Sequence, residues 1–352
     1  MDPRKEARDM TRLRNQNWIA PSVISVALVA IALTFSGCEP GAPVDFAATE
    51  SPTGSPVSTR APANTNRSQS LPPRTNQTIL IASFNIQAFG ESKMNDPWVM
   101  ERIVAILREF DIVAIQEVRA KDQTLMTRLM QLVNAQGARY DYLLGPRLGR
   151  TVSKEQYAYV YDTNRVITSP DASYTIQDEQ DLLHREPLVA RFVTKVPPNV
   201  RPFSFSLVNM HTDPDEVKYE MPVMHTVLKS IREFEYVYAQ EDDVLLMGDL
   251  NASPRQFGPL AQVPGLYWII DKEPTNTIRK SVYDNIIFDR GLTNEYTGRS
   301  GVLDMTQMFG CKTEEALKIS DHLPIWAEFA TFEQVPGVTA QFFGQAGSGS
   351  VR

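Results

Sequence analysis

The sequence predicts an α/β fold, a four-layer sandwich in which two packed, mostly antiparallel β-sheets are flanked by helices. Between residues 78 and 333, many short apolar runs alternate with only a few long helical patterns. No glycine-rich phosphate loop is found after a strand, which argues against the parallel nucleotide-binding folds. The chain has 352 residues, of which 42% are hydrophobic, enough for one large domain or two small ones.

The strands are predicted from short apolar runs bounded by polar or turn-forming residues. The first run, residues 78–86, reads TILIASFNI, and its nearly continuous apolar character indicates a buried strand. Residues 111–116 (DIVAIQ) and 244–247 (VLLM) have the same character. In chain order, the other predicted strands are 140–144, 157–161, 188–192, 203–210, 283–288 and 325–329.

Helices are predicted where apolar residues recur with helical spacing. Pro97 suits the first position of a helix, and the apolar stripe that follows it consists of Val99, Ile103, Ile106, Leu107 and Phe110. Residues 123–134 form a second predicted helix. Residues 216–239 form a long third one, in which Pro222 must lie near the start or kink the helix.

The first 77 residues differ in composition from the rest. A basic stretch precedes a mostly apolar segment, residues 19–35, which ends in small residues and Cys38. This pattern resembles a bacterial lipoprotein signal peptide, residues 1–37, with Cys38 as the lipidated first residue of the mature chain. Residues 38–77 are rich in Pro, Ser and Thr and predict a disordered tether. The folded domain is expected over 78–333, and 334–352 as a flexible tail.

Two other interpretations of the N-terminus stay open. Residues 18–35 are nearly long enough to span a bilayer as an uncleaved anchor. Alternatively, the segment directs ordinary secretion and Cys38 is incidental. All three interpretations place the folded domain outside the cytoplasm, in the cell envelope or the extracellular space.

Charge and cysteine content limit the classes of function. The formal net charge is −7, so no global basic field attracts a polyanion, although phosphate contacts are local and a divalent cation would invert the charge of an acidic cleft. The two cysteines, Cys38 and Cys311, lie in very different settings and do not form a disulfide framework. Cys311 is expected to be a reduced packing residue.

Polar residues recur where the predicted strands end. These are Asn85, Glu117, His211, Asp249 with Asn251, and His322 in the closing Ser-Asp-His. An amide beside a carboxylate can hold a hard cation such as Mg²⁺ through oxygen ligands. A second carboxylate can activate water, and an imidazole held by a carboxylate can donate to phosphate oxygens. The ordered set therefore predicts metal-assisted phosphate chemistry.

Taken singly, each of these residues has a simpler interpretation. A glutamate at a strand end is usually solvated, and Asp249 with Asn251 also suits a turn. A lone histidine is more often structural, and we place His184 and His225 in that class. Asp284 and Glu155 are candidate carboxylates for holding the second nitrogen of an imidazole.

The order and spacing of these motifs resemble the endonuclease/exonuclease/phosphatase superfamily, and within it the deoxyribonuclease I group. The resemblance covers about residues 78–329. The segments that carry it are Phe84–Met94, 112–119, Lys154–Tyr157, Arg185–Pro187, 246–252, Tyr283-Asp284 and Ile319–His322.

The resemblance implies roles for individual residues. Asn85 and Glu117 would bind the catalytic metal, Mg²⁺ or alternatively Mn²⁺, with Asp321 supporting them. Asp249 would position or activate water, and Asn251 would hold that water and a phosphate oxygen. His211 paired with Glu155, and His322 paired with Asp284, would stabilise the pentacovalent phosphate or assist the leaving oxygen. Arg119 and Arg185 would contact backbone phosphates.

The implied activity is endonucleolytic cleavage of DNA with little sequence preference, leaving 5′-phosphates. A monomer without an obligate protein partner is expected, attached to a membrane through its N-terminus. Two alternatives remain: a phosphodiesterase or phosphatase acting on lipid or inositol phosphates, and a binding module without catalysis.

The sequence departs from the pattern of the deoxyribonuclease I group at several positions. Gln87 stands where that group has an arginine that reaches the DNA, and Ser153 where it has a tyrosine. Pro254 and Ser281 replace a long-range disulfide. Residues 274–277 (PTNT) are similar to a structural calcium loop of the group, which implies a Ca²⁺ site there.

Overall fold

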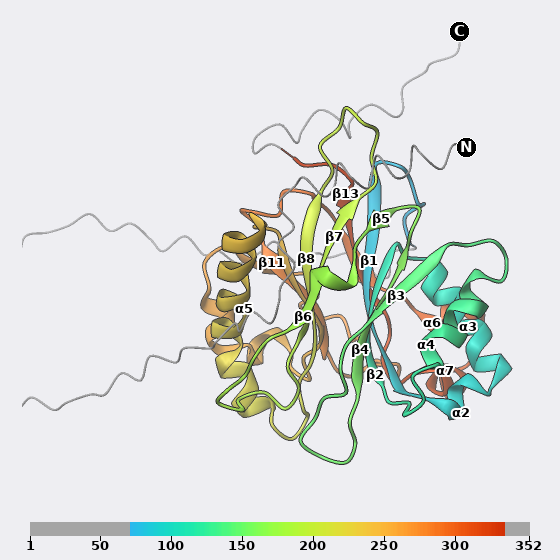
Figure 1. The fold of residues 1–352 in the computed structure, drawn as a ribbon. Coiled ribbons are helices and arrows are strands. Elements are labelled where there is room, and N and C mark those ends of the chain that lie inside the picture. The colour runs from blue at the N-terminus through green and yellow to red at the C-terminus, as the bar shows by residue number, and fades with distance from the viewer. Residues whose placement is uncertain (1–70, 335–352) are drawn as a thin grey trace, which may run out of the picture.

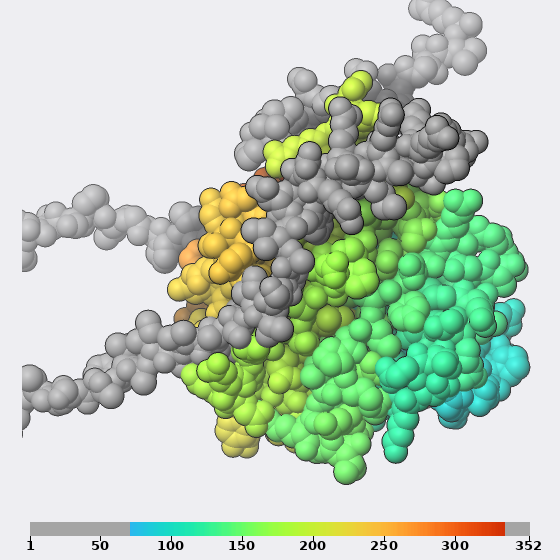
Figure 2. Space-filling model, viewed as in Figure 1, coloured from blue at the N-terminus to red at the C-terminus, as the bar shows by residue number. Residues whose placement is uncertain are grey.

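The computed structural model describes residues 71–334. The predicted signal peptide (1–37), Cys38, the tether up to residue 70 and the tail from residue 335 lie outside the described residues. In space-filling view, the green and blue-green atoms of the described residues pack closely against one another on the face shown (Figure 2). Residues 71–77 fall within the predicted tether, yet the structure packs Leu71 against the core and pairs Arg74 with Asp111 and Asp162. The tether prediction is wrong for these residues, because the buried carboxylate of Asp111 forms an ion pair with Arg74.

The first sheet has six strands in the order β12-β13-β1-β2-β4-β3. Their bounds are β1 Thr78–Phe89, β2 Ile112–Val118, β3 Tyr140–Leu144, β4 Gln156–Asp162, β12 Tyr296–Val302 and β13 Ile325–Ala330.

The second sheet has the order β10-β11-β9-β8-β7-β5, with β6 paired to β7. Its strands are β5 Val166–Ile167, β6 Ser173–Thr175, β7 Leu188–Thr194, β8 Ser204–His211, β9 Val244–Asp249, β10 Leu266–Trp268 and β11 Asp284–Asp289.

Both described sheets are antiparallel except for one central pair each, β1 with β2 and β8 with β9. Each parallel pair needs a crossover connection, which a helix supplies. Helix α3 (Pro97–Arg108) joins β1 to β2, and α5 (Val217–Ala239) joins β8 to β9. Both crossovers bring the carboxyl ends of their two strands to one edge of the sheet, where the candidate residues lie.

The helices cover the outer faces of the two sheets (Figure 1). Helix α5 lies against the second sheet and contains Pro222 within its first turns. The first sheet is flanked by α3 and the remaining helices, which are α2 Glu91–Met94, α4 Leu125–Asn134, α6 Met305–Phe309 and α7 Thr313–Ile319. Asp96 caps α3 by accepting hydrogen bonds from the N–H groups of Trp98 and Val99. The four layers confirm the predicted fold class.

Alternation along the strands decides which side chains face the interior of the sandwich. In β8, Leu207 packs into the core between the sheets, whereas Val208 and Met210 pack against α5. In β9, Leu245 and Met247 face the same interior core. Since residues two apart share a face, Asn209 and His211 in β8 and Asp249 in β9 point toward the opposite sheet.

The long predicted elements are present, with ends shifted by a few residues. The elements β5, β6, β10, β12, α2, α6 and α7 are not among the predictions. Within residues 71–334, no helix combines the length and the apolar character needed to cross a bilayer.

Candidate active site

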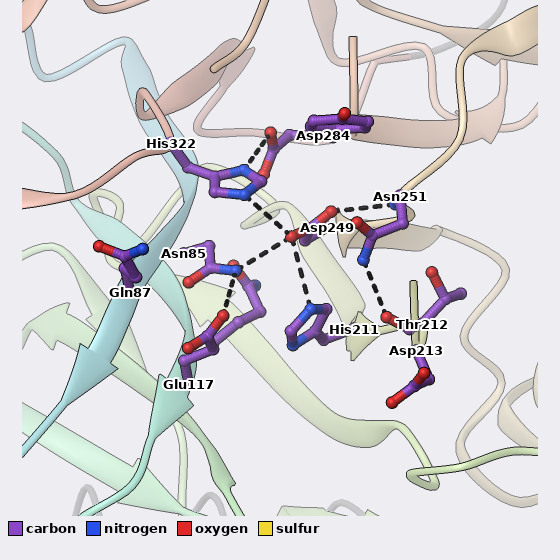
Figure 3. Close-up of polar contacts among 12 residues, drawn as sticks. Asn85, Gln87, Glu117, His211, Thr212, Asp213, Asp249, Asn251, Asp284 and His322 are labelled. Atoms are coloured by element: carbon purple, nitrogen blue, oxygen red, sulfur yellow. Dashed lines mark hydrogen bonds and ion pairs between the residues drawn. The ribbon is translucent and has the colours of Figure 1, made fainter. Parts of the chain in front are cut away.

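The candidate residues meet around one oxygen of Asp249 (Figure 3). Asp249 Oδ2 lies 3.0 Å from Asn85 Nδ2, 3.5 Å from His211 Nε2 and 3.3 Å from His322 Nε2. Glu117 Oε1 accepts a hydrogen bond of 3.2 Å from the same Asn85 amide. Side chains separated by more than two hundred positions in the sequence therefore surround one point at the edge of both sheets.

An irregularity in β2 sets the direction of the Glu117 side chain. The pairing of β2 with β4 shifts register between Ile115 and Val118, and Glu117 adopts a φ of 62°. This left-handed conformation is unfavourable for a residue with a side chain. It turns the carboxylate toward β1, where Glu117 Oε2 accepts a hydrogen bond of 2.7 Å from the Ala88 N–H. Strain of this kind concentrates at functional sites.

His211 is fixed by hydrogen bonds from both its ring and its backbone. Its Nδ1 lies 2.7 Å from Glu155 Oε1, and its backbone N–H donates to the Tyr157 hydroxyl at 2.8 Å. The carboxylate fixes the ring so that Nε2 faces Asp249. Tyr157 is a positioning residue that sequence reasoning did not single out, because a tyrosine inside an apolar strand predicts only packing.

His322 is placed in the same way by Asp284, as expected. Its Nδ1 lies 2.9 Å from Asp284 Oδ2, which also accepts a hydrogen bond of 2.6 Å from the Thr275 hydroxyl. Ser320 anchors the segment by donating to the Asn85 carbonyl at 2.6 Å and accepting from the His322 N–H. The closing Ser-Asp-His segment is thereby tied directly to β1.

The electrostatics favour the charged forms of both imidazoles and of Asp249. Burial alone would lower the pKa of His322, but the charges of Asp284 and Asp249 outweigh it and raise that pKa well above its usual value. The pKa of His211 is raised against burial by Asp249 and Glu155. Burial opposes ionisation of Asp249, but the two imidazoles lower the pKa of its carboxyl. Asp249 can therefore accept a proton while both histidines donate hydrogen bonds.

A divalent cation fits beside Asn85. The buried Asn85 Oδ1 accepts no hydrogen bond from the described residues, and neither does the buried Asp321 Oδ1. Unsatisfied buried oxygens are costly, and hard cations take amide and carboxylate oxygens as ligands. Glu117 supplies the adjacent carboxylate. The donor set of Asn85, Glu117 and Asp321 thus suits Mg²⁺ or Mn²⁺.

Asn251 and the two arginines have different surroundings. Asn251, at a φ of 45°, donates its backbone N–H to Asp249 Oδ1 at 2.9 Å and its amide to the Thr212 carbonyl. The Arg119 side chain is 36% exposed and forms ion pairs with Glu117 Oε2 at 3.0 Å and with Glu155 Oε2 at 3.5 Å. The Arg185 side chain is only 5% exposed and pairs with Glu155. Arg185 therefore faces the protein and positions the Glu155–His211 pair.

Two further residues lie next to the site, and the sequence analysis assigned neither of them a functional role. Lys93 donates to the Ile319 carbonyl at 2.6 Å. Burial lowers the pKa of Lys93 to about 8, against the opposing charges of Asp321 and Glu117. Gln87 donates to Asp321 Oδ2 at 2.8 Å. Polar residues in a loop give no periodic signal, so only coordinates place them beside Asp321.

The remaining sequence predictions concern groups outside this centre. In the 274–277 loop, the side-chain oxygens of Thr275, Asn276 and Thr277 all take part in internal hydrogen bonds. The calcium site expected there stays a prediction. His184 lies near Asp213 and Glu216, and neither His184 nor His225 is among the residues that contact Asp249.

Replacing Asp284 with asparagine should lower the pKa of His322. The substitution removes the largest of the carboxylate charges that favour the imidazolium while keeping a hydrogen-bonding side chain of the same size. The alkaline limb of the pH–rate profile should therefore move to lower pH. Proton NMR titration of the His322 ring in EDTA measures the shift directly, since the chain has only four histidines. An unchanged titration of His322 would refute the pairing.

The chain is similar to known proteins over most of the described residues. Residues 82–322 match the sequence model of the Endonuclease/Exonuclease/phosphatase family. Deoxyribonuclease-1-like 1 from Chlorocebus aethiops is 32% identical over 264 residues, covering 72% of this chain and 84% of that protein. Deoxyribonuclease gamma from Homo sapiens is 31% identical over 271 residues, covering 70% and 84% respectively.

A solved structure supports the fold. The crystal structure of humanized D. rerio TDP2 has a TM-score of 0.50 and 15% identity, covering 72% of this chain and 99% of that one. The family match and the deoxyribonuclease relatives show a phosphodiester hydrolase. The chain belongs to the endonuclease/exonuclease/phosphatase family and is deoxyribonuclease I-like within it.

Proposed function

We propose that this protein is a divalent-metal-dependent endonuclease that hydrolyses phosphodiester bonds in DNA with little sequence preference and leaves 5′-phosphates. The observation that carries the proposal is the convergence of Asn85, His211 and His322 on one oxygen of Asp249. Relatives named deoxyribonucleases, above 30% identity across most of the domain, favour DNA over other phosphodiesters.

In the proposed mechanism, the chain's own groups position the reactants and transfer protons. Asn85 and Glu117, supported by Asp321, would hold a divalent cation, which supplies Lewis-acid stabilisation of the phosphate charge. Asp249 accepts the proton of the attacking water, and its lowered pKa keeps it ionised for that step. His211 and His322 donate hydrogen bonds from Nε2 to the phosphate oxygens and to the leaving oxygen. Arg119 neutralises a neighbouring phosphate.

A plasmid assay tests the activity. The purified protein should nick supercoiled DNA in Mg²⁺, lose activity in EDTA and regain it when Mg²⁺ is restored. Glu117→Ala should lower the rate by about 10²-fold or more, which is within the range of losses expected for catalytic groups. Glu233→Ala, on the outer face of α5 with a 65% exposed side chain, serves as the matched control.

The same reaction reports the product ends and the substrate class. Nicks with a 5′-phosphate and a 3′-hydroxyl are resealed by DNA ligase without kinase treatment. Nicks that need a kinase first would contradict the proposed products. Rapid turnover of sphingomyelin or inositol phosphates with inert DNA would replace the proposal by the lipid- or inositol-phosphate alternative.

Export and lipid anchoring through Cys38 also remain proposals, supported by the basic and apolar pattern of residues 1–38. They would place the nuclease at the cell envelope or outside the cell, where its substrate would be extracellular or periplasmic DNA. A monomeric state is likewise proposed, since no catalytic group has to come from a second copy.

A further inference from the structure

Gln87 contacts the closing Ser-Asp-His segment at two points. Its backbone N–H donates to Ser320 Oγ at 3.2 Å, and its side-chain Nε2 donates to Asp321 Oδ2 at 2.8 Å. The amide must face Asp321 with its nitrogen, because an ionised carboxylate accepts hydrogen bonds and cannot donate one. Gln87 is half-buried near the end of β1, two positions after Asn85. It therefore joins β1 directly to the carboxylate that is expected to support the catalytic metal.

The backbone of Asp321 is fixed separately from its side chain. The Asp321 carbonyl accepts a hydrogen bond of 2.7 Å from the Thr277 N–H, and the Ser320 carbonyl accepts one of 2.7 Å from the Thr277 hydroxyl. These bonds hold the main chain but leave the carboxylate free to rotate. Within residues 71–334, the Gln87 amide is the one group that donates a hydrogen bond to that carboxylate. Its orientation therefore depends on Gln87.

The hydrogen bond from Gln87 occupies one oxygen of Asp321 and leaves the other unused. Asp321 Oδ1 is buried and accepts no hydrogen bond from the described part of the chain. Asn85 shows the same arrangement: its amide nitrogen donates to Glu117 and Asp249 (Figure 3), while its buried Oδ1 has no donor. A hard cation takes carboxylate and amide oxygens as ligands. In both residues, a hydrogen bond at one atom leaves an oxygen available for the cation.

We propose that Gln87 is a positioning residue for the divalent cation: by holding Asp321 Oδ2, it keeps Oδ1 available as a metal ligand. The inference rests on the metal dependence in the proposed function. Groups that hydrogen-bond a ligating carboxylate fix its direction and thereby set the affinity for the metal. An amide suits this task because it donates a hydrogen bond without a positive charge that would compete with the cation for Asp321.

Binding of Mn²⁺ to the full chain, stripped with EDTA and dialysed, tests this role in the absence of DNA. Electron paramagnetic resonance measures the free Mn²⁺ at each concentration. Gln87→Met keeps the length of the side chain but removes the N–H donor, and it should weaken Mn²⁺ binding by about tenfold or more, as loss of a group that orients a metal ligand does. Gln131→Met, the same change at an exposed position of α4, should bind Mn²⁺ like the parent. Parent-like affinity in Gln87→Met would overturn the proposal.

A double-mutant cycle determines whether Gln87 acts through Asp321. Asp321→Asn should itself weaken Mn²⁺ binding, and adding Gln87→Met should then change the affinity by less than about twofold, because the ligand that Gln87 positions is already lost. An equal loss in both backgrounds would contradict the positioning role. Cooperative thermal unfolding of every variant in EDTA separates a loss of binding from a loss of fold.

Cleavage kinetics distinguish this role from a substrate contact and from the nuclease activity itself. At saturating Mn²⁺, Gln87→Met should keep the parent KM for DNA. A raised KM with unchanged Mn²⁺ affinity would assign Gln87 to the substrate and overturn the inference. A parent chain that binds Mn²⁺ in a Gln87-dependent manner yet leaves DNA intact would support the role of Gln87 and contradict the proposed nuclease function, so the two claims fail separately.

Discussion

Replacing Asp249 with asparagine is expected to lower kcat for phosphodiester cleavage by about 10²–10⁴-fold, the usual contribution of a positioned general base. Asparagine has the same size and can still accept a hydrogen bond, but it cannot accept the proton of the attacking water. The buried carboxylate also keeps His211 and His322 charged. Its removal therefore weakens both hydrogen-bond donors to the phosphate in addition to removing the base.

Single-turnover cleavage of a labelled duplex measures this loss, with far-UV circular dichroism and Tm recorded for each variant. Asp141→Asn, at an exposed aspartate on the edge strand β3, is the matched control and should keep the parent rate. The loss should appear in kcat rather than KM, because Asp249 is assigned to proton transfer from the attacking water and not to substrate binding; its side chain is 1% exposed. A rate within tenfold of the parent would remove Asp249 from the chemistry.

The parts of the fold that follow from periodicity were predictable. Apolar runs gave the long strands, and they also placed His211 and Asp249 at the ends of two of them. β12 was not predictable in this way, because its sequence YTGRSGV contains two glycines and little apolar character. It is held instead by its pairing with β13, in which Ser300, Gly301 and Val302 lie opposite Ala327, Trp326 and Ile325.

The backbone conformations that complete the site could not be predicted from the sequence either. Glu117 and Asn251 have left-handed backbone angles, which neither residue type requires. Gln116 Nε2 donates to Asn209 Oδ1 at 2.6 Å and joins the two sheets beneath the site. Both side chains belong to apolar strands in which a polar residue has no predictable partner. Strand periodicity thus gives the direction of a side chain, whereas bulges and contacts between sheets decide which groups meet.

Gly248→Ala should have the largest effect on folding. A Cβ at this position would lie 1.8 Å from the carbonyl oxygen of Met210, its register partner in β8, at a φ of +146°. No side-chain rotation relieves a clash with backbone, so β8 and β9 must separate. We expect a loss of more than about 4 kcal/mol in the free energy of unfolding, in the range reserved for severe disruptions.

Urea denaturation compares this variant with Gly137→Ala, where φ is +85° and no atom lies within 4 Å of the new Cβ. That control isolates the cost of the backbone conformation, about 1–2 kcal/mol. Gly248 stands between Met247 and Asp249, and β9 needs its close approach to β8 to bring Asp249 opposite His211. If Gly248→Ala were no less stable than Gly137→Ala, β9 could not be packed as closely against β8 as the site requires.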